Sequence, residues 1–169
     1  MKRETSRIVI GGQVLKILVL SDTHGDTTIA EKIVKKEKAD LCIHLGDNFK
    51  DAIYINDKLG LEVVGIRGNC DYEEYAEDEM VLDIEGHKLL LTHGHKYNVK
   101  VTLNNLYYKA KSLGCDVALY GHTHKNLKEQ AKDVLIMNPG SLTKPRGSKA
   151  SYGILNVEED SVNARIVEI

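Results

Sequence analysis

The fold is decided by the stretch LKILVLSDTHG, residues 15–25. Its first six residues are rich in branched aliphatic side chains and predict a buried strand over 15–20. The polar turn that follows places Asp22 and His24 directly after the strand, and residues 28–38 then carry the apolar spacing of an amphipathic helix. A strand, a polar turn and a helix in this order are typical of an α/β sheet that binds ligands beyond the carboxyl ends of its strands.

The same unit occurs again farther along the chain. A second strand is predicted over 41–45, followed by a turn over 46–48 and a helix over 49–59 that Gly60 ends. A third strand over 61–66 leads into the polar loop 67–71. Residues 81–85 and 87–92 alternate around Gly86 and predict a hairpin, so the sheet arrangement becomes mixed.

The second half of the chain completes the predicted architecture. A helix is expected over 98–113, with an inward face made by Val101, Leu106, Tyr107 and Ala110. Strands are expected over 116–120, 134–137, 152–157 and 162–167. The prediction is an α/β fold of two packed mixed β-sheets flanked by helices, formed as a single domain by residues 15–169.

Residues 1–14 are expected to be an N-terminal extension outside this domain. Leu15 begins the first strand where a start is expected, and Gly11-Gly12 just upstream could be encoded by a ribosome-binding site. The hypothesis is that the extension is non-native and that Leu15 is the native first residue, read from an alternative start codon. Protein purified from its source would then begin with methionine at position 15.

Composition and charge exclude several classes of protein. With 42% hydrophobic and 28% charged residues, the chain has the composition of a globular protein. Its formal charge of -2 gives no global positive field toward nucleic acid or anionic membranes, although a local basic patch stays compatible with it. No apolar run approaches a membrane span, no signal peptide pattern is seen, and three widely spaced cysteines indicate neither disulfides nor structural zinc. We expect a cytoplasmic protein.

Five polar clusters, each after a predicted strand, carry the chemistry. They occupy residues 22–24, 46–47, 68–71, 93–95 and 121–124. The spacing between consecutive clusters ranges from 22 residues (Asp47 to Asn69) to 29 residues (His93 to His122). Each interval leaves room for one crossover or hairpin before the chain returns to the same sheet edge. Together the carboxylates, imidazoles and amide predict an open site for divalent metal ions, with Asp47 the natural bridge between two of them.

These clusters read as DxH, GD, GN, H and GHxH blocks, and the chain resembles the calcineurin-like metallophosphoesterases from about Leu15 onward. It is most similar to their short single-domain prokaryotic phosphodiesterase branch. The resemblance implies a phosphoesterase, with a phosphodiesterase favoured, in which a hydroxide that bridges two metal ions attacks a small phosphate-ester substrate. It implies one ion on Asp22, His24, Asp47 and His124. It implies the second ion on Asp47, Asn69, His93 and His122.

Manganese is the favoured metal, and zinc, iron, nickel and magnesium are compatible with the same ligands. The candidate catalytic residues are Asn69, Cys70, Asp71 and His95. Cys70 stands where many larger members of the superfamily carry a histidine that protonates the leaving group, although the short prokaryotic branch commonly has this cysteine. We expect His95 to touch the substrate or to orient His93.

Other polar residues have structural or weaker functional interpretations. We expect His44 to be packed inside its strand and His87 to be exposed at a turn. The turn of residues 138–141 is expected to be structural, and through the resemblance it would support the GHxH loop. Lys96, Tyr97, Lys144 and Arg146 are candidates for contact with the rest of the substrate.

Two other functions stay open at this point. The resemblance extends to a eukaryotic retromer subunit of the same fold with a depleted metal site, so the chain could be a metal-binding protein-interaction scaffold. The intact ligand set favours catalysis over that alternative. A nuclease is disfavoured because neither charge nor length supplies a nucleic-acid groove. No membrane partner is expected, and the sequence leaves homo-oligomer formation open.

Overall fold

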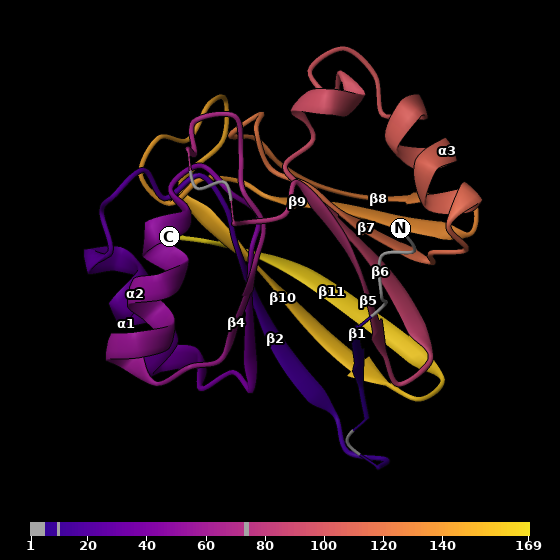
Figure 1. Ribbon diagram of the computed structural model, residues 1–169, viewed down its shortest axis with the longest axis horizontal. Helices are drawn as coiled ribbons and strands as arrows, with labels where there is room; N and C mark the ends of the chain where they lie inside the picture. Colours follow the sequence, from indigo (N-terminus) through magenta and orange to yellow (C-terminus); the bar gives the residue numbers. More distant parts are fainter. Residues whose placement is uncertain (1–5, 10, 73–74) are drawn as a thin grey trace.

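Strand β2 (Leu15–Leu20) lies at the centre of a five-stranded sheet in the computed structural model, which describes residues 6–9, 11–72 and 75–169. Parallel strands β3 (Leu41–His44) and β4 (Val63–Gly65) follow it on one side. The antiparallel strands β10 (Ser151–Glu158) and β11 (Ser161–Glu168) complete the sheet on the other. Helices α1 (Thr28–Glu37) and α2 (Phe49–Leu59) cover its outer face (Figure 1).

A second, six-stranded sheet packs against the first. Its strand order is β1-β5-β6-β7-β9-β8, with both parallel and antiparallel pairs. The strands are β1 (Ser6–Ile8), β5 (Glu79–Ile84), β6 (His87–Thr92), β7 (Val117–Leu119), β8 (Asn126–Ala131) and β9 (Val134–Pro139). Helix α3 (Asn104–Ser112) packs on its outer side, and the short 3-10 helix η1 (His95–Tyr97) precedes α3 (Figure 1).

The main hydrophobic core lies between the two sheets. Successive side chains of a strand point to opposite faces, so Ile17 and Val19 face the other sheet while Leu18 and Leu20 pack under the helices. Leu89 and Leu91 of β6 enter the same core from the second sheet, and all six side chains are almost completely buried. The core thereby fixes the strand ends of the two sheets relative to each other.

The predicted fold class is confirmed: in the described part of the chain, two mixed sheets are flanked by three α-helices. The hairpin at Gly86 and the end of α2 at Gly60, which adopts the left-handed conformation, are also confirmed. Thr27 is the N-cap residue of α1, and no side chain caps this helix. The Thr28 N–H is instead bonded to the Asp26 carboxylate, 3.0 Å away.

The predicted helix over 98–113 is also wrong in its first part. Asn98 has a φ of 55°, which interrupts helical geometry, and α3 begins only at Asn104. Val101 was expected to face inward and is 77% exposed. Strands β1 and β8 were not predicted; β8 has four polar residues among its six, so it lacks an apolar alternation.

Residues 6–8 of the N-terminal segment pair in parallel with β5 as β1. Residues 1–5 and 10 lie outside the described part of the chain. That the first 14 residues are a non-native extension stays a prediction. No helix in the described ranges has the length and apolar character needed to cross a membrane.

The central core predicts a large cost for truncating Leu89, which is fully buried between the sheets. Leu89→Ala is expected to lower the free energy of unfolding by about 2–5 kcal/mol, because it leaves a cavity as well as removing apolar contact. Leu113→Ala is the matched control, since Leu113 is 38% exposed at the end of α3 and should cost far less. Urea denaturation of both variants measures the difference; equal losses would contradict this placement of the core.

Candidate metal centre

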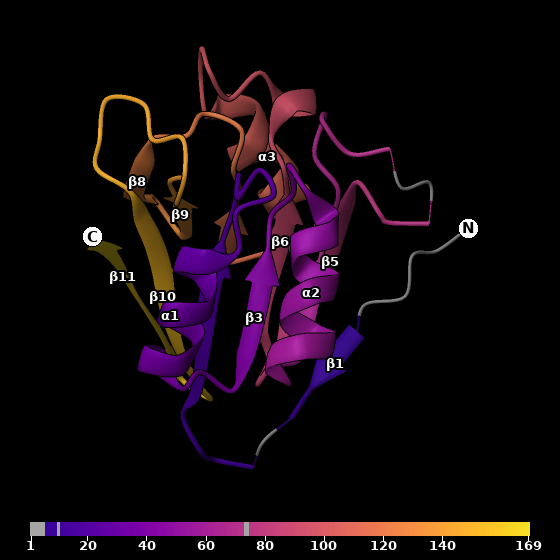
Figure 2. The ribbon, with the colours of Figure 1, turned by 90° about the vertical axis from the view of Figure 1, so that its left-hand side faces the viewer.

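The loops after β2, β3, β4, β6 and β7 meet at one end of the sandwich. Figure 2 shows β3 pointing toward the top of the view, where loops from both sheets gather. Backbone hydrogen bonds join the loops directly: the Asp22 N–H donates to the Gly46 carbonyl at 3.0 Å, and the Gly121 N–H donates to the His93 carbonyl at 3.1 Å. The polar clusters of the sequence therefore lie together, as their spacing predicts.

Four of the seven predicted ligands form a compact group. They are Asp22, His24, Asp47 and His124, and one donor atom from each lies within 4.8 Å of the others. The two carboxylates and His124 are buried, with exposed fractions of 0%, 3% and 5% respectively. This group matches the set that the resemblance implies for one ion.

The remaining predicted ligands adjoin this group on the side of Asp47. The His93 Nε2 atom lies 3.3 Å from Asp47 Oδ1, and the rings of His93 and His122 have centroids 5.1 Å apart. Asn69 is exposed, and its side-chain nitrogen lies 3.4 Å from the Cys70 sulfur. Asp47 thus stands between the two predicted sets, although the second set is less compact than the first.

Backbone carbonyls fix the orientation of two of the imidazoles. The Nδ1 atom of His124 lies 2.7 Å from the Lys144 carbonyl, and that of His93 lies 2.7 Å from the Leu45 carbonyl. A carbonyl can only accept, so each Nδ1 carries the proton, and in the neutral ring Nε2 presents its lone pair. Both lone pairs point toward the carboxylates of the site.

These donor atoms fit a cation. His124 Nε2 lies 3.1 Å from Asp22 Oδ1 and 3.3 Å from His24 Nε2, so lone pairs of three ligands converge. The buried atoms Asp22 Oδ1 and His93 Nε2 have no hydrogen-bond partner among the described residues. One proton can bond to only one or two of these lone pairs, whereas a divalent cation can accept lone pairs from all of these ligands together.

The pKa values follow from burial and from these contacts. Burial alone raises the pKa of Asp47, but His93 and the Cys70 N–H outweigh it and hold the pKa well below the ordinary range of a carboxyl group. Burial, followed by the proximity of His93 and Lys100, lowers the pKa of His122 to about 4. Asp47 is therefore ionised and His122 neutral near pH 7, the forms in which both bind metals.

Local backbone geometry also marks the site. Positive φ angles occur at five of the predicted ligands: Asp22 (54°), His24 (51°), Asp47 (58°), His122 (67°) and His124 (59°). Such conformations cost energy for residues with a Cβ atom and are concentrated at functional sites. The sandwich core and the hydrogen bonds between loops hold them in place.

Glycines in the motifs allow the loops to touch. A Cβ atom on Gly46 would lie 2.4 Å from the Gly68 nitrogen, and one on Gly68 would lie 2.3 Å from Asp47 Oδ1. A Cβ atom on Gly121 would lie 2.0 Å from the Ser21 hydroxyl oxygen. These separations are shorter than any real contact of a Cβ atom, so the loops reach their positions only with glycine here.

Asp71 joins two of the loops through backbone contacts. Its Oδ2 accepts the N–H groups of Asp47 at 2.9 Å and Gly68 at 2.8 Å. Its Oδ1 accepts those of Asn48 and Phe49, both at 2.8 Å, where helix α2 begins. The contacts are those of a residue that positions Asp47, and its predicted catalytic role stays untested.

The remaining histidines and Cys70 have distinct surroundings. His44 is completely buried and its Nε2 bonds with the Thr23 hydroxyl at 2.9 Å, which confirms the packed interpretation. His87 is half-buried against Asp116, so its predicted exposure is wrong. His95 lies with its ring centroid 5.6 Å from that of His93 and 6.1 Å from that of His122. Cys70 is exposed beside Asp47, whose Oδ1 accepts its N–H at 3.0 Å.

The turn of residues 138–141 supports the site, as predicted. The Asn138 amide donates to the Gly121 carbonyl at 2.8 Å and to the Thr123 hydroxyl at 3.0 Å. The Ser141 hydroxyl donates to the Asp22 carbonyl at 2.8 Å. Sequence reasoning missed the carbonyls of Leu45 and Lys144 that orient the imidazoles, because every residue type supplies a carbonyl and no side-chain signal marks them.

Comparison with known proteins agrees with this site. Residues 15–160 match the family model of the calcineurin-like phosphoesterase superfamily domain. The chain is 37% identical over 158 residues to the probable metallophosphoesterase YsnB of Bacillus subtilis (strain 168), with 91% of each chain covered. It is 30% identical over 184 residues to the phosphodiesterase YfcE of Escherichia coli (strain K12), covering 89% of this chain and 92% of that protein.

The fold is also that of Vps29 from Entamoeba histolytica, solved in complex with zinc. The two structures agree with a TM-score of 0.74 at 21% sequence identity, over 90% of this chain and 98% of the other. The two-sheet sandwich and the aspartate–histidine cluster at its end define a metal-dependent phosphoesterase. The chain belongs to the calcineurin-like phosphoesterase superfamily.

The contacts of Asp71 predict a loss of both stability and metal affinity in Asp71→Asn. An amide can accept only through its oxygen, so two of the four backbone N–H groups lose their acceptor, and hydrogen bonds to charged groups contribute about 1.5–3 kcal/mol each. Asp57→Asn, at an exposed position on α2, is the matched control. Denaturation and calorimetric metal titration measure the two effects. Unchanged metal affinity in Asp71→Asn would show that the position of Asp47 does not depend on this carboxylate.

Proposed function

We propose that this protein is a binuclear metal-dependent phosphodiesterase. The observation that carries the proposal is the convergence of ionised carboxylates and imidazole lone pairs on one buried point, beside a second group that shares Asp47. Asp22, His24, Asp47 and His124 would hold one ion, and Asp47, Asn69, His93 and His122 the other. The naming of the relative YfcE as a phosphodiesterase supports the choice of a diester substrate.

The bound ions would supply Lewis acidity and an activated water at neutral pH. The protein contributes position: Asp47 stands between the two sets of ligands, and the carbonyls of Leu45 and Lys144 keep the histidine lone pairs aimed at the site. Manganese is our proposed metal, because it accepts mixed oxygen and nitrogen ligands. A cytoplasmic location is part of the same proposal.

The alternative is a protein-interaction scaffold that binds metal without turnover. Its support is the shared fold with Vps29, whose solved structure includes zinc. Catalysis has the stronger support, because all seven predicted ligands are present at one end of this sandwich and candidate proton donors adjoin them. The two functions differ in one measurable property, which is hydrolysis by the metal-loaded protein.

The first test replaces a ligand. His122→Asn is expected to lower kcat/KM for bis(p-nitrophenyl) phosphate about 100-fold or more, because changes even to residues behind the ligands cost about 10- to 100-fold. His87→Asn is the matched control. His87 is the first residue of β6 and His93 follows the last, so at roughly 3.3 Å per residue the two lie about 20 Å apart. A chelator should abolish turnover and manganese restore it. Hydrolysis by His122→Asn within a few fold of the parent would favour the scaffold.

The number of ions is tested separately by metal analysis of the loaded protein. Two equivalents per chain are expected for the parent, and fewer for Asp47→Asn, because both predicted sets include that carboxylate. His87→Asn should keep two. One equivalent or none in a fully loaded parent would contradict the binuclear centre while leaving hydrolysis to be judged by the first test.

The second test concerns protonation of the leaving group. Cys70 carries no positive charge, because a thiol is either neutral or anionic, and burial and contact with Asp47 raise its pKa and favour the neutral form. We expect a steep dependence of kcat/KM on leaving-group pKa, and aryl diesters should react faster than alkyl ones by about 10²- to 10⁴-fold, the usual scale of general acid catalysis. Cys70→His is expected to narrow this gap by assisting alkyl esters.

A series of methyl phosphodiesters with graded phenol and alcohol leaving groups provides the measurement. The comparison variant is His95→Asn, because the His95 ring lies near His93 and His122 and its Nδ1 has no hydrogen-bond partner among the described residues. If kcat/KM depends weakly on leaving-group pKa in the parent and steeply in His95→Asn, His95 supplies the proton. The proposed effect of Cys70 on leaving-group dependence would then be wrong.

A further inference from the structure

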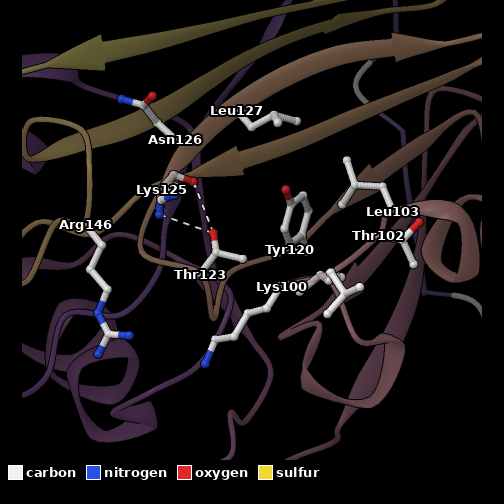
Figure 3. A pocket seen from close by; sticks show the side chains of 11 residues that line it. Lys100, Thr102, Leu103, Tyr120, Thr123, Lys125, Asn126, Leu127 and Arg146 are labelled. Atoms are coloured by element: carbon white, nitrogen blue, oxygen red, sulfur yellow. Dashed lines mark hydrogen bonds between the residues drawn. The ribbon is translucent and has the colours of Figure 1, made fainter.

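A pocket opens beside the loop that carries His122 and His124. Its volume is about 460 Å³, and Figure 3 shows the side chains that line it. Three are cationic (Lys100, Lys125 and Arg146), and four are aliphatic (Val99, Val101, Leu103 and Leu127). They come from the segment before α3, from the start of β8 and its preceding loop, and from the loop after β9.

The pocket adjoins the loop that carries two ligands of the candidate metal centre. Thr123, which lies between the two histidine ligands, is part of its wall, and Figure 3 places this residue between Lys100 and Arg146. The Arg146 N–H donates to the His124 carbonyl at 3.0 Å. A substrate held at the metal centre therefore has this pocket beside it.

The three cations of the pocket lack acidic partners among the residues that the structure describes. Within the described ranges, none of them forms an ion pair, whereas several other lysines do, including Lys96 with Asp78 at 2.6 Å and Lys109 with Glu79 at 3.1 Å. The chain as a whole has a formal charge of -2, so this cluster is a local excess of positive charge. Unpaired cations that surround a cavity favour an anionic ligand.

The aliphatic residues indicate what else the ligand contains. Val101 is 77% exposed, and Leu103 and Leu127 are half-buried at the pocket. The buried ring of Tyr120 adds a further apolar surface. Apolar walls with a few polar or charged groups are typical of sites for organic ligands. The ligand should therefore carry a ring or carbon skeleton next to its negative charge.

We propose that this pocket binds the part of the phosphodiester substrate remote from the scissile phosphate, and that this part carries a second phosphate next to a ring. The substrate class is a nucleotide-like diester with a further terminal phosphate. The proposal rests on the proposed phosphodiesterase function and adds its specificity. Lys100, Lys125 and Arg146 contact the second phosphate, and Val101, Leu103 and Leu127 contact the ring-bearing portion.

The experiment compares two substrates with the same leaving group. They are the p-nitrophenyl ester of thymidine 5′-phosphate and the same ester with an additional 3′-phosphate. The metal-loaded parent should prefer the 3′-phosphorylated ester in kcat/KM by about tenfold or more, the effect of one charge-assisted hydrogen bond. The preference should fall as ionic strength rises, because the three cations are exposed to solvent.

Two charge-reversal variants test the pocket itself. Lys100→Glu should reduce the preference to about one or below, since it replaces attraction by repulsion. Lys36→Glu changes the net charge equally at an exposed position on α1, in the layer that covers the other sheet, and should keep the parental preference. Equal kcat/KM for the two esters in the parent, or equal effects of the two variants, would overturn the proposal.

The apolar wall is tested with Val101→Ser. This variant should lower kcat/KM for the thymidine ester about threefold relative to methyl p-nitrophenyl phosphate, which has no ring to place in the pocket, because contact with roughly one CH₂ group is lost. Because Val101 is exposed, its replacement should not impair folding, so a folding defect would not explain a loss confined to the thymidine ester. An equal effect on both esters would remove Val101 from the site.

Failure of the pocket and failure of the enzyme function give different results. If the parent hydrolyses bis(p-nitrophenyl) phosphate but does not distinguish the thymidine esters, the pocket proposal fails alone. If the parent hydrolyses no ester, the proposed function fails, and calorimetric binding of thymidine 3′,5′-bisphosphate to the metal-loaded protein decides the pocket. Binding that Lys100→Glu weakens and Lys36→Glu does not would support it, and any other binding result would overturn it.

Discussion

The structure depends on the neutralisation of two carboxylates, Asp22 and Asp47, that are buried at one end of the sandwich. Burial of an ionised carboxylate costs several kcal/mol unless a partner compensates it. Their partners include imidazoles whose Nδ1 protons are already donated to backbone carbonyls, as at His93 and His124. Metal cations resolve this conflict, because one ion accepts lone pairs from several of these groups. Metal binding and the integrity of the loops are therefore parts of a single equilibrium.

The scaffold that holds these groups combines a rigid core with directed hydrogen bonds. Ile17 and Leu89 pack in the same core from opposite sheets and keep the strand ends together. Asp71 joins the loop of Asp47 to that of Gly68, and Ser141 joins the last part of the chain to Asp22. The ligands can adopt positive φ angles because these contacts leave their backbone no alternative position.

The sequence was most informative where side-chain pattern and structure correspond. Strand β2 was predictable from its aliphatic run, and its polar turn marked the edge at which Asp22 and His24 lie. Strand β8 could not be predicted, because its sequence NLKEQA has few apolar residues and the strand is stabilised by pairing with β9. The backbone carbonyls that orient the histidines could not be predicted from the sequence, because every residue type has a backbone carbonyl. The error at Val101 arose because an exposed aliphatic residue next to a pocket has the same sequence spacing as one in a helix interior.

The contact between Gly46 and Gly68 is made by main-chain atoms, so no side chain sets the distance between these two loops. Most of the pocket wall, by contrast, consists of side chains outside the loop that carries His122 and His124, from which Thr123 alone lies between two ligands. Mutation can therefore replace the residues that choose a substrate and leave the reaction centre undisturbed. One inherited centre is then open to divergence into enzymes of different selectivity through changes in residues 99–103, at the start of β8 and in the loop of Arg146.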